Sequence, residues 1–327
     1  MRMSRMNVPD APTICPWPGD KRWVYSITFD EALADLHRFA IPILERHNVP
    51  GHLEVVVGHI GNVRQIGQSS FNGYRHMNAD ELREMIARGW GVGNHTWSHE
   101  QIQPRDVDRE IRQARDVLAE AVGEPITVYC SAGDNSNMSD HVLDACRACG
   151  YLGAMSLTDA LNRPDDENLL WMNRTFLHDQ AYGPFFSEFD PFRNIAHARH
   201  DRGWLIDYLH CPLEVPVHRN KDCSADQLQR RIETIVSEGG EDLWLARVED
   251  AMDYRYVRRH ARIESVDGGW RVSTEALPEG VRRRSVTLRL PDNVQTVTVD
   301  AESVKINRGL IDVDLNQPRV IKPEPRR

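Results

Sequence analysis

The chain has 327 residues, of which 40% are hydrophobic and 27% charged, which is typical of a globular protein with a full core. Its 40 Lys and Arg against 49 Asp and Glu give a formal net charge of −9. This balance lacks the basic excess that neutralises phosphates, so we expect no nucleic-acid partner. No apolar run approaches the roughly 18–20 residues that span a bilayer, and we expect no membrane partner either.

The N-terminal stretch Met1–Pro18 has two arginines but no apolar core of the kind found in secretory signals. As it stands, the sequence predicts a cytoplasmic protein. A chain whose signal peptide had been removed would look the same and would be secreted or periplasmic. Among six cysteines only Cys146 and Cys149 form a C-x-x-C pair, and no second pair lies at zinc-finger spacing. Buried free thiols are therefore favoured over a redox or metal site.

Short apolar runs alternate with helical periods over most of the chain. Trp23–Phe29 is a predicted strand, and apolar residues follow at helical spacing from Leu33 to Leu44, with Pro42 near a kink or a start. Asn78 and Glu81 form a capping-box-like helix start. The other predicted strands are Leu53–Val57, a short run from Val92, Ile126–Cys130, Tyr151–Ser156, Trp204–His210 and Leu243–Val248. The other predicted helices are Asp106–Ala121, one capped by Ser139, one opened by Ser224 and Gln227, and one through Tyr256. Repeated strand–helix units indicate parallel strands with helices outside, in a barrel or an open doubly wound sheet.

The last part of the chain has a different pattern. From Ile263 it contains short strand-like runs broken by Gly, Pro and Asn, which predicts a small all-β appendage. Pro318–Arg327, with three prolines, is expected to be disordered. The expected division is an N-terminal extension (1–20), a large α/β domain (21–262), a β-rich domain (263–317) and a tail (318–327).

Three polar features each follow a predicted strand. The first is Thr28-Phe29-Asp30-Glu31, in which the acids either favour a helix N-terminus or serve a metal and a water. The second is His95-Thr96-Trp97-Ser98-His99, whose two histidines lie on one face of a helical turn and either converge on a metal or are solvated. The third is Leu209-His210. Because the loops after barrel strands open on one face, all three are expected at one rim.

The order of these features resembles the polysaccharide deacetylase (NodB-homology) family of carbohydrate esterases. T-F-D-E corresponds to the family's T-F-D-D, and His95 to His99 corresponds to its H-[ST]-x-x-H. Leu209-His210 corresponds to its leucine–histidine pair further downstream. The resemblance covers residues of about 20 to 262 and implies a distorted (β/α) barrel of NodB type with a small C-terminal all-β appendage. It further implies that Asp30 is the general base, that His210 is the general acid, and that Glu31, His95 and His99 bind one divalent metal. Zn²⁺ is the first choice, with Co²⁺, Mn²⁺ or Ni²⁺ as alternatives.

The chain also departs from the family pattern. Glu31 replaces the second Asp, and the Arg-x-Pro-Tyr-like third motif is absent from the corresponding segment 129–134. The resemblance makes the Ala132 N–H the candidate oxyanion donor, and Arg174 a candidate to replace the arginine that orients the base. The long stretch from Asp159 to His200 forms either a substrate wall or a loop over its own hydrophobic cluster, because four phenylalanines lie close together in it: Phe185, Phe186, Phe189 and Phe192.

The resemblance implies a metal-dependent hydrolase that cleaves a linear C–N amide bond and removes an N-acetyl group from a sugar or polysaccharide. A carbohydrate is thus the expected partner, and a homo-oligomer is possible. Two alternatives stay open. The same site would suit a non-sugar amide or a cyclic imide, or the chain is a catalytically silent, carbohydrate-binding relative.

Overall fold

The computed structural model describes residues 10–166, 168–180 and 188–324, and the chain folds into two compact units. One unit is Trp23–Glu249, and the other combines Met1–Arg22 with Asp250–Arg327. The break at residue 249 falls earlier than the expected domain end at 262. Two of the phenylalanines of the expected aromatic cluster, Phe185 and Phe186, lie outside the described residues.

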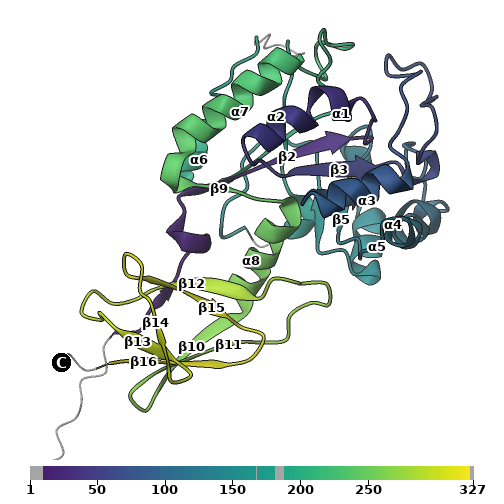
Figure 1. Cartoon of the computed structure of the whole chain (residues 1–327). Helices are drawn as coiled ribbons and strands as arrows, with labels where there is room; N and C mark the ends of the chain where they lie inside the picture. Colours follow the sequence, from purple (N-terminus) through teal and green to yellow (C-terminus); the bar gives the residue numbers. More distant parts are fainter. Residues whose placement is uncertain (1–9, 167, 181–187, 325–327) are drawn as a thin grey trace, which may run out of the picture. The chain divides into compact units, whose positions relative to one another are not determined.

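The unit Trp23–Glu249 is built on a curled sheet of parallel strands (Figure 1). The strands are β2 (Trp23–Asp30), β3 (Gly51–Val55), β4 (Gly91–Asn94), β5 (Val128–Cys130), β6 (Gly153–Met155), β7 (Thr175–Phe176), β8 (Trp204–Leu209) and β9 (Leu243–Leu245). Their order is β6-β5-β4-β3-β2-β8-β7, with β9 paired to β2. A bridge from Met155 to Met172 brings the edge strand β6 to the segment that continues into β7. Residues 172–176 thereby link the two edges, and the expected distorted (β/α) barrel is confirmed.

Helices cover the outside of this sheet. They are α1 (Leu36–Phe39), α2 (Ile41–Arg46), α3 (Ala79–Ala87), α4 (Ala114–Val122), α5 (Asp140–Cys149), α6 (Ile195–Asp201) and α7 (Ala225–Gly239), and the chain passes between the units within α8 (Val248–His260). A π-helical segment, Asp108–Gln113, leads into α4. Helices α3 and α4 contact β4, α6 contacts β2 and β8, and α2 packs on α7. The predicted capping boxes begin α3 at Asn78 and α7 at Ser224. All eight residues of β2 are buried, as expected for a strand covered on both faces.

The second unit consists of two antiparallel sheets. One has the order β1-β12-β15 and the other β10-β11-β16-β13-β14. The strands are β1 (Thr13–Ile14), β10 (Ala261–Val266), β11 (Gly269–Thr274), β12 (Ser285–Arg289), β13 (Val297–Val299), β14 (Glu302–Val304), β15 (Leu310–Asp314) and β16 (Arg319–Pro323). The predicted all-β segment is therefore present, and β1 completes one of its sheets.

The expectation of a disordered tail is wrong for residues 319–323. These residues form β16, which pairs with both β11 and β13. Ile321 is fully buried between them, so the tail contributes to the core despite its prolines. The cysteines behave as expected, since all six are free thiols. No helix in the described ranges combines the length and the apolar character needed to cross a membrane.

A buried ionic triad lies inside the barrel. His52 on β3 contacts Glu54 through Nδ1 at 2.5 Å and lies with Nε2 3.2 Å from the Glu249 Oε1. Gly91 on β4 makes room for this arrangement, because a Cβ there would come within 2.4 Å of both the His52 ring and the Glu249 carboxylate. Burial alone would lower the pKa of His52, but the two carboxylates raise it to about 10. The triad therefore holds an imidazolium between two anions.

We expect His52→Gln to destabilise the protein by about 3–5 kcal/mol near pH 6.5, because two buried carboxylates lose their cation. The folded pKa of His52 lies above the unfolded value, so its contribution is complete below pH 6.5 and is lost as the pH rises through about 10. Urea unfolding from pH 6.5 to 10.5 should show the difference between the two proteins shrinking with pH. The exposed His141 provides the control variant His141→Gln. A pH-independent difference would contradict the charged triad.

Candidate active site

The rim of the barrel gathers the polar residues that the sequence singles out. Asp30 ends β2, His95 follows β4 and His210 follows β8. Residues just after two of these strands adopt left-handed backbone, with φ of 70° at Glu31, 69° at Thr96 and 61° at His99. Such values are uncommon for residues other than glycine and concentrate at functional sites. Here they occur at or next to four residues that line one cavity, which are Asp30, Glu31, His95 and His99.

Asp30 is held by Arg174, which rises inside the barrel from the segment before β7. The guanidinium donates to Asp30 Oδ1 at 2.6 Å and Oδ2 at 3.3 Å, and also to the Thr28 hydroxyl. Arg174 is fully buried and stacks over the Tyr208 ring at 4.3 Å. Burial alone would raise the pKa of Asp30, but Arg174 above all lowers it to about 2. Asp30 is therefore an oriented, ionised carboxylate.

The small side chain of Cys130 lies beside this pair, where the family's third motif is expected. Its Sγ is 3.8 Å from Asp30 Oδ1. Burial raises the pKa of this thiol well above its ordinary value, so it stays protonated. The Arg174 guanidinium reaches Asp30 from the segment just before β7. Segment 129–134 contains no arginine, and the arginine that pairs with Asp30 comes instead from position 174.

Glu31 has an arginine of its own. Arg64 donates to Glu31 Oε1 at 2.7 Å through Nη2 and to Oε2 through Nε, which makes the contact bidentate. Both side chains are at most 4% exposed. Burial alone would raise the pKa of Glu31, but the Arg64 hydrogen bonds lower it to about 2. Both neighbouring carboxylates are therefore ionised and neutralised by separate arginines.

The two predicted histidine ligands lie next to these acids. Their rings are 5.1 Å apart, His99 Nε2 is 3.6 Å from Glu31 Oε1, and His95 Nε2 is 4.0 Å from Asp30 Oδ2. His95 Nδ1 lies 3.2 Å from the Cys130 carbonyl, which can only accept, so Nδ1 carries the proton and Nε2 keeps its lone pair. Burial lowers the pKa of both histidines, that of His99 to about 3. Both are neutral imidazoles at pH 7.

His210 stands across the same space and is oriented by Asp222. The Asp222 Oδ1 accepts from the His210 backbone N–H at 2.6 Å and lies 3.3 Å from His210 Nδ1. The imidazole stacks on Phe71 with ring centroids 4.8 Å apart. Although burial lowers the pKa of His210, Asp222 raises it above its ordinary value. His210 is thus suited to carry a proton.

These groups enclose one cavity of about 290 Å³. Its lining consists of Asp30, Glu31, Arg64, Phe71, His95, His99, Gly133, Leu157, Phe176, Tyr208, His210, Asn220 and Lys221. Gly133 belongs to the lining, whereas its neighbour Ala132 is buried next to it, and an oxyanion role for Ala132 stays a prediction. The cavity combines an apolar wall of Phe71, Phe176 and Tyr208 with a polar floor.

The donor set suits a divalent cation. Two neutral imidazoles and an ionised carboxylate are ligands that zinc prefers, and a histidine whose second nitrogen donates to a carbonyl is typical of metal ligands. Among the described residues, the three potential ligands whose donor atoms all lie within 4.8 Å of one another are Asp30, His95 and Cys130, whereas Glu31, His95 and His99 do not form such a group. His95 is common to both sets. In each set the carboxylate already pairs with an arginine.

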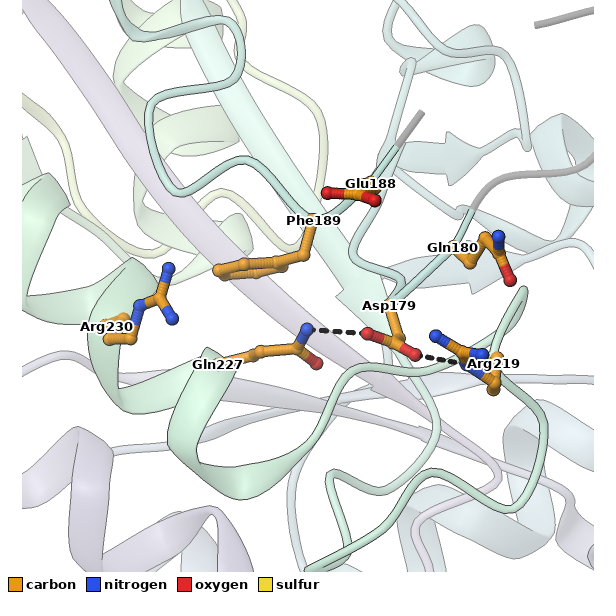
Figure 2. A pocket seen from close by; sticks show the side chains of 7 residues that line it. All are labelled: Asp179, Gln180, Glu188, Phe189, Arg219, Gln227 and Arg230. Atoms are coloured by element: carbon orange, nitrogen blue, oxygen red, sulfur yellow. Dashed lines mark hydrogen bonds and ion pairs between the residues drawn. The ribbon is translucent and has the colours of Figure 1, made fainter. Parts of the chain in front are cut away.

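A second cavity, of about 330 Å³, lies beside the loop 218–221 (Figure 2). Figure 2 shows its central Asp179 held between Arg219 and Gln227, with Arg230 over the Phe189 ring. The Gln227 amide donates to Asp179 Oδ1 at 2.7 Å. The Asp179 carboxylate is therefore paired with neighbouring side chains. The predicted catalytic residues and metal ligands line the first cavity and not the second.

Several residues of the site were not predicted from the sequence. Arg64, Phe71 and Asp222 lie in loops without a periodic pattern, and one arginine or aspartate in a loop looks like any other. The T-F-D-E motif offered one indirect indication of Arg64. A glutamate in place of the family's aspartate has a longer reach, and that reach brings its carboxylate to the guanidinium.

Comparison with known proteins confirms the resemblance. Residues 19–154 match the family model described as polysaccharide deacetylase, which places this segment, less than half of the chain, in that family. The matched range contains Asp30, Glu31, His95 and His99, and ends before Arg174 and His210. No curated protein matches the chain significantly.

Solved structures of several deacetylases are similar to this chain. A candidate polysaccharide deacetylase from Mycobacterium smegmatis is 18% identical, with 75% of this chain and 93% of that chain covered and a TM-score of 0.48. A family 4 acetyl xylan esterase from Clostridium thermocellum, solved with cobalt, is 16% identical over 70% and 89%, with a TM-score of 0.43. A Bacillus cereus polysaccharide deacetylase is 17% identical over 46% of each chain, with a TM-score of 0.38. This chain therefore spans about half the length of that relative, and these likenesses are too distant to transfer residue roles.

The Asp222–His210 contact makes a prediction that is independent of any substrate. We expect Asp222→Asn to lower the pKa of His210, because the neutral amide no longer stabilises the imidazolium. Histidine C–H resonances followed by NMR over a pH titration measure the shift. Glu214→Gln, on the same loop and with a side chain 74% exposed, is the control and should leave the titration unchanged. An unaltered pKa of His210 in Asp222→Asn would show that the carboxylate does not govern its charge.

Proposed function

We propose that the protein is a hydrolase of the polysaccharide deacetylase class that removes an N-acetyl group from an N-acetylated sugar. The observation that carries this proposal is that two groups prepared for proton transfer line one cavity. Asp30 is an ionised carboxylate fixed by Arg174, and His210 is an imidazole whose proton is stabilised by Asp222. A base and an acid facing the same space are what amide hydrolysis requires.

In this proposal, Asp30 accepts a proton from the attacking water while the water oxygen bonds to the acetyl carbon. The C–N bond then breaks, and His210 gives its proton to the leaving nitrogen. The products are acetate and a free amine. Arg174 keeps Asp30 ionised and aimed, and Asp222 keeps the His210 ring in place. The apolar wall of Phe71, Phe176 and Tyr208 offers aromatic faces on which a sugar ring can stack.

The low pKa of Asp30 supports a role for a metal in this chemistry. A carboxylate with a pKa of about 2 is a weak base toward ordinary water. Glu31, His95 and His99 would hold a divalent ion, with Zn²⁺ the first choice for two nitrogens and one carboxylate. Such an ion would lower the pKa of a bound water to about 7. The pKa difference between that water and Asp30 would then be smaller than for ordinary water.

We expect purified protein supplied with zinc to release acetate from N-acetylated chito-oligosaccharides. Asp30→Asn should reduce kcat by about 10²–10⁴-fold with little change in KM, because the amide cannot accept the proton. Asp80→Asn, which changes an acid with a side chain 88% exposed, is the matched control and should keep full activity. Acetate release and zinc content are both measured.

The same assay distinguishes the alternatives. Turnover of cyclic imides without acetate release from sugars would replace the sugar by a small imide. Binding of chito-oligosaccharides with no turnover of either substrate class would indicate a silent, carbohydrate-binding relative. Unchanged zinc content in a His95→Ala, His99→Ala double variant would refute the assigned ligands.

A further inference from the structure

We propose that Arg64 is a built-in competitor of the divalent cation for Glu31, so that the protein binds metal only after this guanidinium is displaced. The inference rests on the proposed metal site and adds a residue that controls it. Arg64 occupies both oxygens of the one carboxylate among the three proposed ligands. A cation that binds Glu31 must therefore compete with a bidentate, buried contact.

The arginine is held in place by its own loop. Its Nη1 donates to the Asn72 side chain at 2.9 Å, and its backbone N–H donates to the Tyr74 carbonyl at 2.7 Å. The same Asn72 oxygen accepts from the Ile66 N–H. Arg64 is thus oriented by contacts other than its pair with Glu31, and an oriented guanidinium loses less entropy on pairing than a free one.

The loop is in turn attached to the segment that carries Glu31. His76 Nδ1 lies 2.7 Å from the Glu31 carbonyl, and the Met77 N–H donates to the Ala32 carbonyl at 2.9 Å. Leu33 and His76 form an antiparallel bridge. Because both partners of the ion pair belong to one hydrogen-bonded unit, the Arg64–Glu31 contact is part of the folded framework.

Charge balance points the same way. Asp30 and Glu31 are matched one to one by Arg174 and Arg64, so the two carboxylates are neutralised without a metal. A divalent ion added beside both arginines would leave an excess of two positive charges in a buried site. Such an excess is costly at low dielectric, and moving Arg64 away reduces it.

The length of the Glu31 side chain allows its contact with Arg64. The family motif has aspartate here, one methylene shorter than Glu31. An aspartate would withdraw its carboxylate from Arg64 and leave it nearer the backbone. Glutamate at this position and Arg64 in the loop therefore act together, and either substitution should release the site to the metal.

The test is the zinc affinity of the full chain, measured by competition with a chromophoric chelator and independent of any substrate. We expect Arg64→Gln to bind Zn²⁺ at least tenfold more tightly than the unchanged protein, and Glu31→Asp to bind it more tightly as well. The second variant keeps the inference falsifiable if the first does not fold. Arg75→Gln is the matched control, because Arg75 lies on the same loop and makes a bidentate pair with Glu81. Its zinc affinity should equal that of the unchanged protein.

The possible failures are distinguishable. Equal zinc affinity with and without Arg64, lost on His95→Ala with His99→Ala, would refute the competitor and leave the metal site standing. Absence of zinc binding from every variant would refute both. Tighter binding in Arg64→Gln that survives the two histidine substitutions would refute the assignment of the ligands and the competitor together.

Discussion

Two adjacent carboxylates buried at the end of one strand are the constraint on which the site depends. Asp30 and Glu31 are 3% and 1% exposed, and an unpaired buried carboxylate costs several kcal/mol. Each is neutralised from a different direction, Asp30 by Arg174 from within the barrel and Glu31 by Arg64 from the loop above it. The segment before β7 supplies Arg174, and the loop 62–76 supplies Arg64. The imidazoles between them stay neutral and available.

Most of what the sequence predicted correctly rests on local patterns. The helix starts predicted at Asn78 and Ser224 are confirmed by capping boxes, and the mainly apolar run Trp23–Phe29 forms a strand, as predicted. The placement of Asp30, His95 and His210 at one rim follows from parallel strands ending together. These statements need only neighbouring residues and the general rule for parallel sheets.

What the sequence did not predict depends on partners that are distant along the chain. Arg64 meets Glu31 across 33 positions, and His52 meets Glu249 across nearly 200, with no periodic pattern to connect them. Strand β16 was missed for a related reason. Its apolar residues Val320 and Ile321 are flanked by prolines and charges, and only pairing with β11 and β13 makes them part of a core.

The strand pairing of β1 has a consequence for the order in which the molecule assembles during synthesis. Thr13 and Ile14 are synthesised before the barrel residues, yet they pair with Arg289 and Leu288, which are synthesised after them. The barrel residues Trp23–Glu249 are complete long before that partner exists. Because domains fold as units during translation, the barrel is able to form first, while the N-terminal strand waits for its sheet. Residues translated after the barrel thus complete a sheet that includes a strand translated before it.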